Sequence, residues 1–393
     1  MRTSTEVFFI RGMLFKLPAM DSVMNDINLK LHLRQCIQKV ATGPEYSKDL
    51  SYDEAYYAMR HLLDPSVDLV QAAIYLIALR MKRETDEENR GTLQALIDSA
   101  IIKTAQVPEV IDLSDPYDGY ARGVPASSFA PAVFAALGIP TVLHGLKQVG
   151  PKYGATHHLI LKAAGLTTGL SPDAATQQLE TLGWTYIDQA QFAPQLHALV
   201  PLRQRMIKRQ ILTTVETLLA PIRGQQKTHY ISGYVHQAYP PIYASLAKQA
   251  RFASAAFVRG VEGGVIPSLQ QAGKLFYYRH PNDELQQLNL EPQLIGIEST
   301  TRSIPLPENL PPAPMITDEI ASMVDSNALA KESARLGLAA LAGERGLMYD
   351  SLVYICAIGL VHLQRHSHLV EAADAVRAIL NSGKALEIFR AAA

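Results

Sequence analysis

The sequence predicts an all-α domain at the N-terminus, followed by a large α/β domain with a mostly parallel sheet. Between about residues 25 and 100, apolar residues recur at helical spacing. From about residue 110, short apolar runs alternate with helical segments, as in strands joined by crossover helices. Helical patterns return from about residue 318 to the end. A chain of 393 residues, 48% of them hydrophobic, is long enough to bury the cores of two domains.

The helical domain is expected over residues 25–105, after a flexible extension at residues 1–24. Residues 51–54 and 85–88 each form a capping box, in which a serine or threonine begins a helix and a glutamate three residues later reaches back to it. Charges such as Arg11 interrupt the extension, which therefore lacks the unbroken apolar core of a signal peptide. No stretch approaches the roughly 20 apolar residues of a membrane span, so no membrane partner is expected.

The α/β domain is expected over residues 106–393, including the C-terminal helices. Its candidate strands are short apolar runs at residues 110–113, 141–143, 185–187, 229–235 and 255–261. Ser171 and Pro172 form a helix start, and Gly183 ends that helix. Aromatic residues at 277–280 indicate a strand edge, and the prolines of residues 303–314 indicate a linker or surface loop.

Net charge and cysteine content narrow the class of protein. The formal net charge is −1 and the sequence pI is about 6.9, so nothing attracts the whole molecule to nucleic acid or to an anionic membrane. Any site for a polyanion must be a local patch. Cys36 and Cys356 are too few for a disulfide framework and favour a reduced, cytoplasmic protein.

Two basic segments give the strongest signal for a binding site. Residues 144–154 place Lys147 and Lys152 among three glycines. Glycines let backbone N–H groups approach an anion closely, and lysines balance its charge. Residues 203–209 pack four cations into seven positions. Together the two segments predict a pocket for a phosphorylated or polyanionic ligand.

The first of these segments resembles the anthranilate phosphoribosyltransferase family. In that family a helix of small residues and a strand lead into the motif His-Gly-Asn-Arg-Ser-x-Ser-Ser-Lys-x-Gly-Ser-x-Asp. Here residues 129–143 lead into His144-Gly145. Lys147 then falls on the family's arginine, Lys152 on its lysine and Gly154 on its second glycine.

The resemblance continues beyond this motif. Arg203 and Arg209 match a pair of family arginines at the same spacing, and residues 379–386 are similar to the family's C-terminus. The likeness covers most of the chain after about Leu29. It implies a homodimer formed through the helical domain, C-terminal helices that complete that domain, and a ligand cleft between the two domains.

The resemblance also implies a set of site residues. Those on the phosphate side would be Asp118, Gly119, Arg122, Ser127, Ser128, His144, Gly145, Lys147, Lys152, Gly154 and Thr156. Arg203 and Arg209 would lie on the side of the acceptor.

Departures from the family pattern bear on catalysis. The family's Gly-Thr-Gly-Gly-Asp-Gly loop, which cradles pyrophosphate, corresponds here to residues 115–128 and has lost most of its glycines. The family's Asp-Glu pair, which helps to hold magnesium, falls on Val265 and Ile266, which cannot bind a hard cation. Glu262 is close in sequence but is expected to point elsewhere, and nothing indicates that Glu216 replaces the pair.

Each candidate also has a simpler explanation. Lys147 and Lys152 can be solvated loop lysines, and Arg203 and Arg209 can form ion pairs within the protein. The adjacent histidines at 157–158 point apart and lack a third ligand, so no metal ligand is assigned. A surface position at the end of a helix is expected for three further histidines, His362, His366 and His368.

Two functions remain open from the sequence. The first is a protein that resembles the family but lacks its phosphoribosyltransferase activity. It would bind a phosphorylated small molecule or nucleic acid in the cleft between the two domains. The second is an active phosphoribosyltransferase that uses phosphoribosyl pyrophosphate, an aromatic or heterocyclic acceptor, and Mg²⁺. No cofactor is assigned otherwise, and Mg²⁺ enters only with this second function.

Overall fold

A computed structural model describes residues 20–314 and 321–393, so most of the extension predicted at residues 1–24 lies outside the described residues. The N-terminal bundle contains α1 (Met20–Val40), α2 (Tyr52–Leu62), α3 (Leu69–Lys82) and α4 (Asp86–Ser99). Both predicted capping boxes are confirmed. The side chains of Ser51 and Thr85 accept hydrogen bonds from the backbone N–H groups of Glu54 and Glu88, respectively. Each glutamate carboxylate in turn accepts a hydrogen bond from the backbone N–H of the capping residue. These caps fix where α2 and α4 begin.

The α/β domain is built on a seven-stranded sheet within the described residues, in the order β4-β3-β2-β6-β7-β8-β9. Its strands are β2 (Glu109–Ser114), β3 (Thr141–Gly145), β4 (Trp184–Asp188), β6 (Lys227–Tyr234), β7 (Ser254–Arg259), β8 (Gly273–Tyr278) and β9 (Gln286–Leu290). The first five strands in the sheet are parallel, and β8 and β9 add an antiparallel edge. A separate pair, β1 (Lys103–Thr104) and β5 (Ile222–Arg223), is also parallel.

Helices join and cover these strands. Those before the C-terminal group are α5 (Ala130–Ala136), α6 (His157–Ala163), α7 (Pro172–Leu182), α8 (Gln189–Phe192), α9 (Pro194–His197), α10 (Val200–Met206), α11 (Ile211–Val215) and α12 (Tyr239–Gln249). As predicted, α7 starts at Ser171 and ends at Gly183, which adopts a left-handed conformation with φ 78°. No helix in residues 20–314 or 321–393 is both long enough and apolar enough to cross a membrane.

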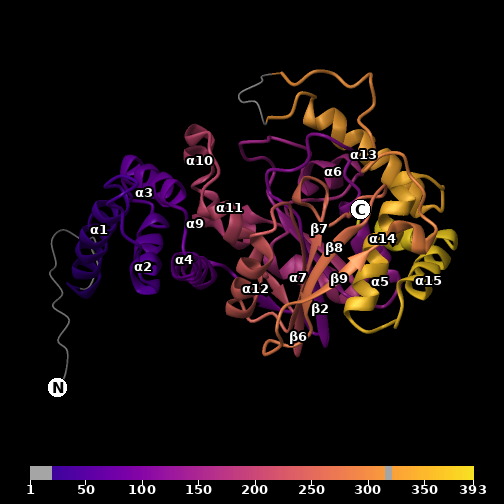
Figure 1. Cartoon of the computed structure of the whole chain (residues 1–393), viewed down its shortest axis with the longest axis horizontal. Helices are drawn as coiled ribbons and strands as arrows, with labels where there is room; N and C mark the ends of the chain where they lie inside the picture. Colours follow the sequence, from indigo (N-terminus) through magenta and orange to yellow (C-terminus); the bar gives the residue numbers. More distant parts are fainter. Residues whose placement is uncertain (1–19, 315–320) are drawn as a thin grey trace, which may run out of the picture.

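The C-terminal helices differ from one detail of the prediction. They are α13 (Ser326–Leu341), α14 (Leu347–His362), α15 (Leu369–Asn381) and α16 (Lys384–Arg390), and they pack on α5, α6 and one another. Figure 1 shows them on the side of the α/β domain away from the bundle. The bundle is extended instead by helices from the middle of the chain, because α10, α11 and α12 contact α3 and α4. The prediction that C-terminal helices complete the bundle is therefore corrected.

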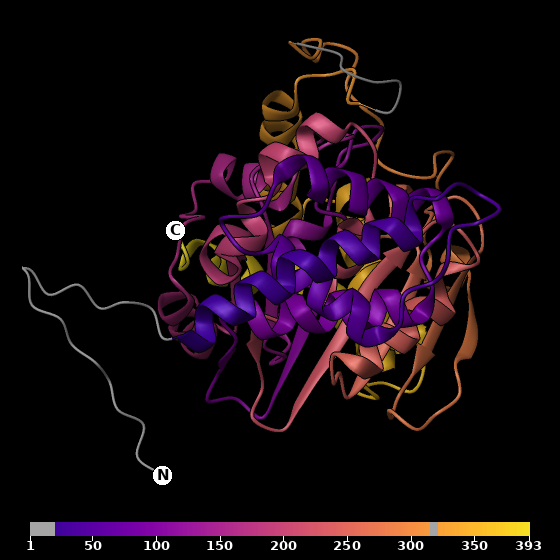
Figure 2. The same ribbon diagram turned by 90° about the vertical axis from the view of Figure 1, so that its left-hand side faces the viewer.

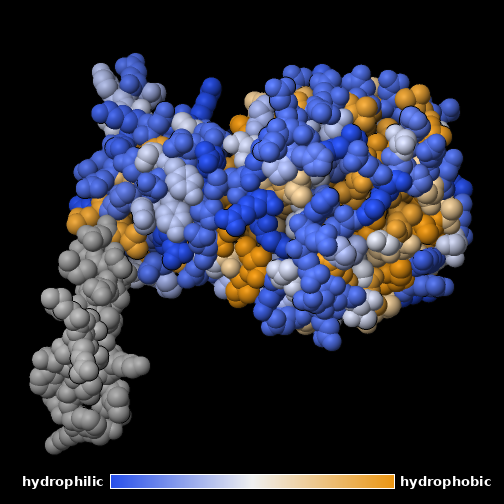
Figure 3. Space-filling model, turned by 90° about the horizontal axis from the view of Figure 1, so that it is seen from below, coloured by the Kyte–Doolittle hydropathy of each residue, from blue (hydrophilic) through white to orange (hydrophobic). Residues whose placement is uncertain are grey.

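Successive side chains of a strand point to opposite faces of the sheet, and each face packs into its own apolar core. Along β2, Ile111 and Leu113 pack with the C-terminal helices, whereas Val110 packs with the residues of the bundle. Viewed from the bundle side, the bundle helices cross in front of the sheet domain (Figure 2). The surface narrows where the bundle meets the larger domain (Figure 3). The sheet is thus buried on both faces, as its apolar parallel strands predict.

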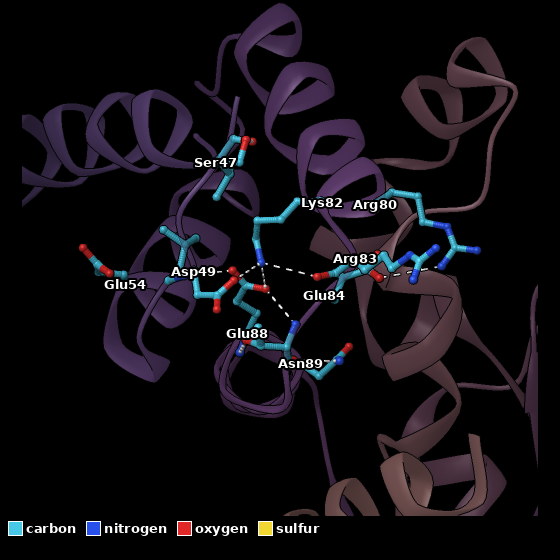
Figure 4. Close-up of polar contacts among 12 residues, drawn as sticks. Ser47, Asp49, Glu54, Arg80, Lys82, Arg83, Glu84, Glu88 and Asn89 are labelled. Atoms are coloured by element: carbon cyan, nitrogen blue, oxygen red, sulfur yellow. Dashed lines mark hydrogen bonds and ion pairs between the residues drawn. The ribbon is translucent and has the colours of Figure 1, made fainter. Parts of the chain in front are cut away.

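A buried ion pair ties the start of α4 to the end of α3 (Figure 4). The Nζ atom of Lys82 lies 2.9 Å from Glu88 Oε2 and 2.6 Å from Asp49 Oδ1. The Glu88 side chain is fully buried and also accepts hydrogen bonds from the backbone N–H groups of Leu50 and Thr85. The positive charge of Lys82 therefore offsets the free-energy cost of burying the Glu88 carboxylate.

Replacing Lys82 with methionine is expected to destabilise the protein by about 2 kcal/mol, because Glu88 keeps its burial and loses a charged hydrogen-bond donor. The free energy of unfolding, measured in urea, checks this expectation. Lys39→Met is the matched control, because Lys39 pairs with Glu54 while 41% exposed. Equal losses for the two variants would contradict a special role for the buried pair.

Candidate anion-binding site

Two loops meet at the carboxyl ends of β2 and β3. The backbones of Tyr120 and Ala155 exchange two hydrogen bonds, of 3.0 and 2.8 Å. Gly154 packs so closely that a Cβ there would lie 2.3 Å from the Tyr120 carbonyl oxygen. Gly119 has φ +74° and faces the Ala155 backbone, where a Cβ would lie 2.8 Å from the carbonyl group. Both glycines therefore hold the two loops together, a role that only a residue without a side chain can fill.

Three of the predicted site residues meet at Asp118. The Arg209 guanidinium donates to Asp118 Oδ2 at 2.8 Å, and Lys152 Nζ lies 3.4 Å from Oδ1. Asp118 and Lys152 are nearly buried, whereas the Arg209 side chain is 43% exposed. The structure thus brings the 115–128 loop, the 144–154 loop and the 203–209 segment together. That a ligand binds where they meet stays a prediction.

Glu262 joins this group, which corrects the expectation that it points elsewhere. Its carboxylate accepts hydrogen bonds from the backbone N–H groups of Ala121, at 3.0 Å, and Arg122, at 2.8 Å. Glu262 Oε2 also lies 3.7 Å from Lys152 Nζ. Residue spacing alone could not reveal this arrangement, because it depends on how the turn at residues 260–264 folds back on the loop.

A buried polar network supports the loop from below. The Ser128 hydroxyl lies 2.8 Å from His157 Nδ1, and His157 Nε2 lies 3.5 Å from Asp115. Asp115 also accepts hydrogen bonds from the hydroxyl groups of Ser127 and Tyr120 and from the backbone N–H of Val265. Burial lowers the pKa of His157, so this ring is neutral at pH 7. The hydroxyl groups of Ser127 and Ser128 are thus occupied within this network. Two other members of the network, Asp115 and His157, were not predicted from the sequence as site residues.

His144 lies inside the sheet domain and has no exposed surface. Its Nε2 atom is 2.9 Å from Asp112 Oδ1 and 2.8 Å from the Ser114 hydroxyl, and its Nδ1 contacts the Tyr117 hydroxyl. This imidazole links β2 to β3 and its ring nitrogens are already satisfied. The adjacent Gly145 ends β3 and is also buried.

The remaining residues of the 144–156 loop differ in exposure. Thr156 begins α6: its hydroxyl accepts from the Leu159 N–H and donates to the Lys147 carbonyl oxygen. Holding that carbonyl fixes the backbone of Lys147, whose side chain is exposed. Thr156 therefore positions the loop, and Lys147 is free to meet a ligand from solvent.

The two arginines of the 203–209 segment have different surroundings. Arg203 forms two hydrogen bonds with the Glu216 carboxylate, of 2.7 and 2.6 Å, and both side chains are 1% exposed. The ion pair within the protein is thus present at Arg203, and a contact with an acceptor there stays a prediction. Arg209 keeps nearly half of its surface in solvent while it pairs with Asp118.

Further exposed cations lie on the three segments that meet at Asp118. In the part of the chain that the structure describes, Arg122, Lys147, Arg205 and Lys208 are exposed and form no ion pair. Two of them, Arg205 and Lys208, lie on the same segment as Arg209, at the end of α10 and directly after it, and α10 contacts α3 of the bundle. The segments therefore carry a paired centre at Asp118 and four exposed cations without an ion pair among the described residues, Arg122, Lys147, Arg205 and Lys208, which we call the basic rim.

The carboxylates present do not form a protein site for Mg²⁺. Within residues 20–314 and 321–393, no group of three or more acidic, histidine or cysteine side chains is placed to hold a metal ion. Val265 is fully buried and Ile266 is nearly so, and both are apolar. Glu216 is held by Arg203, and the carboxylates of Asp118 and Glu262 already face cations or N–H donors. This donor set does not fit the ligands that Mg²⁺ prefers.

Two family models match the chain. The model described as the helical bundle domain of a glycosyl transferase family matches residues 34–100, and the model of that family's α/β domain matches residues 121–304. An anthranilate phosphoribosyltransferase of Aquifex aeolicus is 22% identical over 357 residues, which cover 91% of this chain and 96% of the relative. An uncharacterized protein of the same organism is 26% identical over 266 residues, covering 68% and 79%.

Solved structures show the same fold. Anthranilate phosphoribosyltransferase from Thermus thermophilus has a TM-score of 0.68 at 19% identity, over 92% of this chain and 98% of that one. The enzyme from Saccharomyces cerevisiae, in complex with PRPP and Mg, has a TM-score of 0.71 at 16% identity, over 92% and 97%. The likeness extends over the bundle and the sheet domain together.

Proposed function

The chain belongs to the glycosyl transferase family that joins a helical bundle domain to an α/β domain, and on that premise we propose that it binds a phosphorylated or polyanionic ligand without the standard phosphoribosyl transfer. The observation that carries the proposal is the convergence of Lys152 and Arg209 on the 115–128 loop, with exposed Arg122 and Lys147 at its rim. Cations that come from separate segments and meet at one loop suit a ligand with more than one negative charge.

The loss of standard transfer is inferred from the residues around the loop. The positions that the family uses for magnesium carry the buried apolar side chains of Val265 and Ile266. Glu216 is tied to Arg203 and does not replace them. Without carboxylates to position the metal, the developing charge on a departing pyrophosphate lacks its main counterion. The basic residues are still present, so we expect the chain to bind an anionic ligand although it does not catalyse phosphoribosyl transfer.

Isothermal titration with phosphoribosyl pyrophosphate, with and without Mg²⁺, tests this proposal. We expect micromolar binding that is the same in both conditions and that weakens as salt is raised. Magnesium-dependent binding, followed by release of pyrophosphate when anthranilate is added, would instead establish an active transferase. Failure to bind phosphoribosyl pyrophosphate, together with failure to bind a single-stranded oligonucleotide, would overturn the anion site.

The exposed rim favours a polyanion over a single phosphate. Arg205 and Lys208 lie next to Arg209 on a segment that contacts the bundle, so they extend the basic surface along the junction of the two domains. A nucleic acid strand bound there would neutralise several phosphates at once. Its affinity would then fall steeply with salt, because each neutralised phosphate releases counterions. The slope of log affinity against log salt gives the number of contacts.

Replacing Lys147 and Lys152 together with alanine is expected to weaken binding of phosphoribosyl pyrophosphate at least tenfold, because both cations of the 144–154 loop are lost. Titration calorimetry measures the change, and a melting curve confirms that the variant is folded. Lys384→Ala, at an exposed position of α16, removes a charge elsewhere and should leave the affinity unchanged. Unchanged affinity in the double variant would place the ligand outside this loop.

We further propose a homodimer formed through the bundle, in a cytoplasmic protein. Large apolar side chains are exposed on α1, α2 and α3: Leu31, Tyr57, Leu69, Val70, Ile74 and Met81. Covering them in a second copy would remove apolar surface from water. Sedimentation velocity of Val70→Glu with Ile74→Glu should then give a monomer where the unmodified protein gives a dimer. A monomer for both would contradict the proposal.

A further inference from the structure

The centre of the site already holds a negative group that belongs to the chain. The Glu262 carboxylate accepts hydrogen bonds from two successive backbone N–H groups, those of Ala121 and Arg122, and lies 3.7 Å from Lys152 Nζ. The Glu262 side chain is only 8% exposed. Adjacent N–H groups together with an ammonium group form a cradle suited to an oxyanion, and here a carboxylate fills it.

The backbone at Glu262 is shaped to deliver this carboxylate. Residues 261–263 form a 3₁₀ turn in which Glu262 has φ +55° and ψ 15°, a left-handed conformation that is unusual for a residue with a side chain. The turn is pressed against the loop, since a Cβ at Gly264 would lie 1.6 Å from the Tyr120 hydroxyl oxygen. Contacts with the rest of the protein therefore hold Glu262 in a conformation that it would not choose alone.

The cavity next to the Glu262 turn is small. A cavity of about 20 Å³, room for about one water molecule, lies between the turn and the loop and is lined in part by Glu262, Tyr120, Gly123 and Ile304. This cavity is too small for a phosphate group. At the cradle itself, a second anion beside the Glu262 carboxylate would be repelled by it. An oxyanion can reach the two N–H groups only after the carboxylate has left.

We propose that Glu262 is an internal competitor, an autoinhibitory carboxylate that a phosphate group of the ligand must displace from the Ala121–Arg122 cradle. This inference rests on the proposed function, because it presumes that an oxyanion binds at the loop. The incoming phosphate takes over the two N–H donors and Lys152, and Glu262 moves out toward water. The exchange weakens the binding of small inorganic anions and favours ligands that also reach Arg122, Lys147 and Arg209.

Removing the competitor is expected to strengthen the binding of inorganic pyrophosphate. Titration calorimetry without added metal should show at least tenfold tighter binding for Glu262→Ala than for the unmodified protein. Glu262→Gln keeps the shape and loses the charge, so its affinity should lie between the two. Glu371→Gln, on the exposed first turn of α15, makes the same charge change elsewhere and should leave the affinity unchanged. Circular dichroism and melting curves establish that each variant is folded.

The outcomes separate this inference from the proposed function. Equal affinity of the unmodified protein, Glu262→Ala and Glu262→Gln would overturn the competitor while leaving the phosphate site in place. Weaker binding in both variants would also overturn it, by showing that Glu262 helps to hold the ligand. No binding of pyrophosphate by any of the proteins, Glu262→Ala included, would overturn the competitor, whereas the anion site itself is tested by phosphoribosyl pyrophosphate and the oligonucleotide. Should Glu262→Ala fail to fold, Glu262→Gln gives the same comparison without creating a cavity.

Discussion

Replacing Arg203 with methionine is expected to destabilise the protein by about 3–5 kcal/mol, a larger loss than that expected for Lys82→Met. The Glu216 carboxylate would keep its burial and lose both hydrogen bonds from the guanidinium, of 2.7 and 2.6 Å. The one side-chain donor left to it among the described residues is the Gln189 amide, at 3.0 Å. Urea unfolding of the variant at pH 7 measures the loss.

Two further variants identify the cause. Arg203→Met combined with Glu216→Met removes both charges and should recover much of the loss, because a buried pair replaced by apolar groups is often nearly neutral. Arg205→Met, two residues further along and exposed, should change the stability little. If the double variant is no more stable than Arg203→Met, the loss comes from packing and not from the unpaired carboxylate.

Acidification is expected to destabilise the fold through a second buried cluster. The Ser254 hydroxyl lies 2.8 Å from His229 Nδ1 and 2.8 Å from His362 Nε2, so it links the two rings across β6, β7 and α14. Burial, with Lys227 nearby, lowers the pKa of His229 to about 4, although Glu109 lies 3.3 Å away. Burial, His229 and Arg279 lower the pKa of His362 to about 3.

The direction of the effect follows from these pKa values. Both lie below the ordinary histidine pKa of about 6.5, so between pH 6.5 and pH 4 the unfolded chain binds protons that the folded chain does not. The stabilising contribution is complete above pH 6.5 and is lost as the pH falls. Two histidines would lower the free energy of unfolding by about 4 kcal/mol between pH 7 and pH 5.

Urea unfolding at pH 7 and pH 5 checks this expectation. Replacing His229 with glutamine should reduce the pH dependence by about one proton, because one of the two titrating rings is gone. His280→Gln, at an exposed position, should behave like the unmodified protein. A His229→Gln variant with the full pH dependence would show that other groups carry the effect.

Features set by neighbouring residues could be predicted from the sequence. Both capping boxes, the end of α7 at Gly183 and the five parallel strands follow from local patterns, and each is present. The edge strand β9 was not predicted, because Gln286, Gln287 and Asn289 give it a polar character. Trp184 is fully buried in the core at the start of β4.

Features set by contacts between distant segments could not be predicted. The family resemblance assigned Asp118, Lys152 and Arg209 to the ligand site, but only the fold reveals that Asp118 pairs with both cations. Glu262 was expected to point away, because its left-handed turn depends on packing against Tyr120. His362 was expected on the surface and is instead buried, because α14 packs on the sheet and places it against Ser254. His366 and His368, beyond the end of α14, keep more of their surface.

The apolar core on the bundle side bears on whether the bundle is a separable unit. This core runs without a break from Leu33 and Tyr75 in the bundle to Tyr230 and Phe257 in the sheet. A chain cut after residue 105 would expose the faces of α3 and α4 that α10, α11 and α12 cover. Residues 34–100 are therefore matched as a separate unit by their sequence, but we do not expect them to be stable without the sheet domain. We expect the bundle and the sheet to unfold in a single cooperative transition.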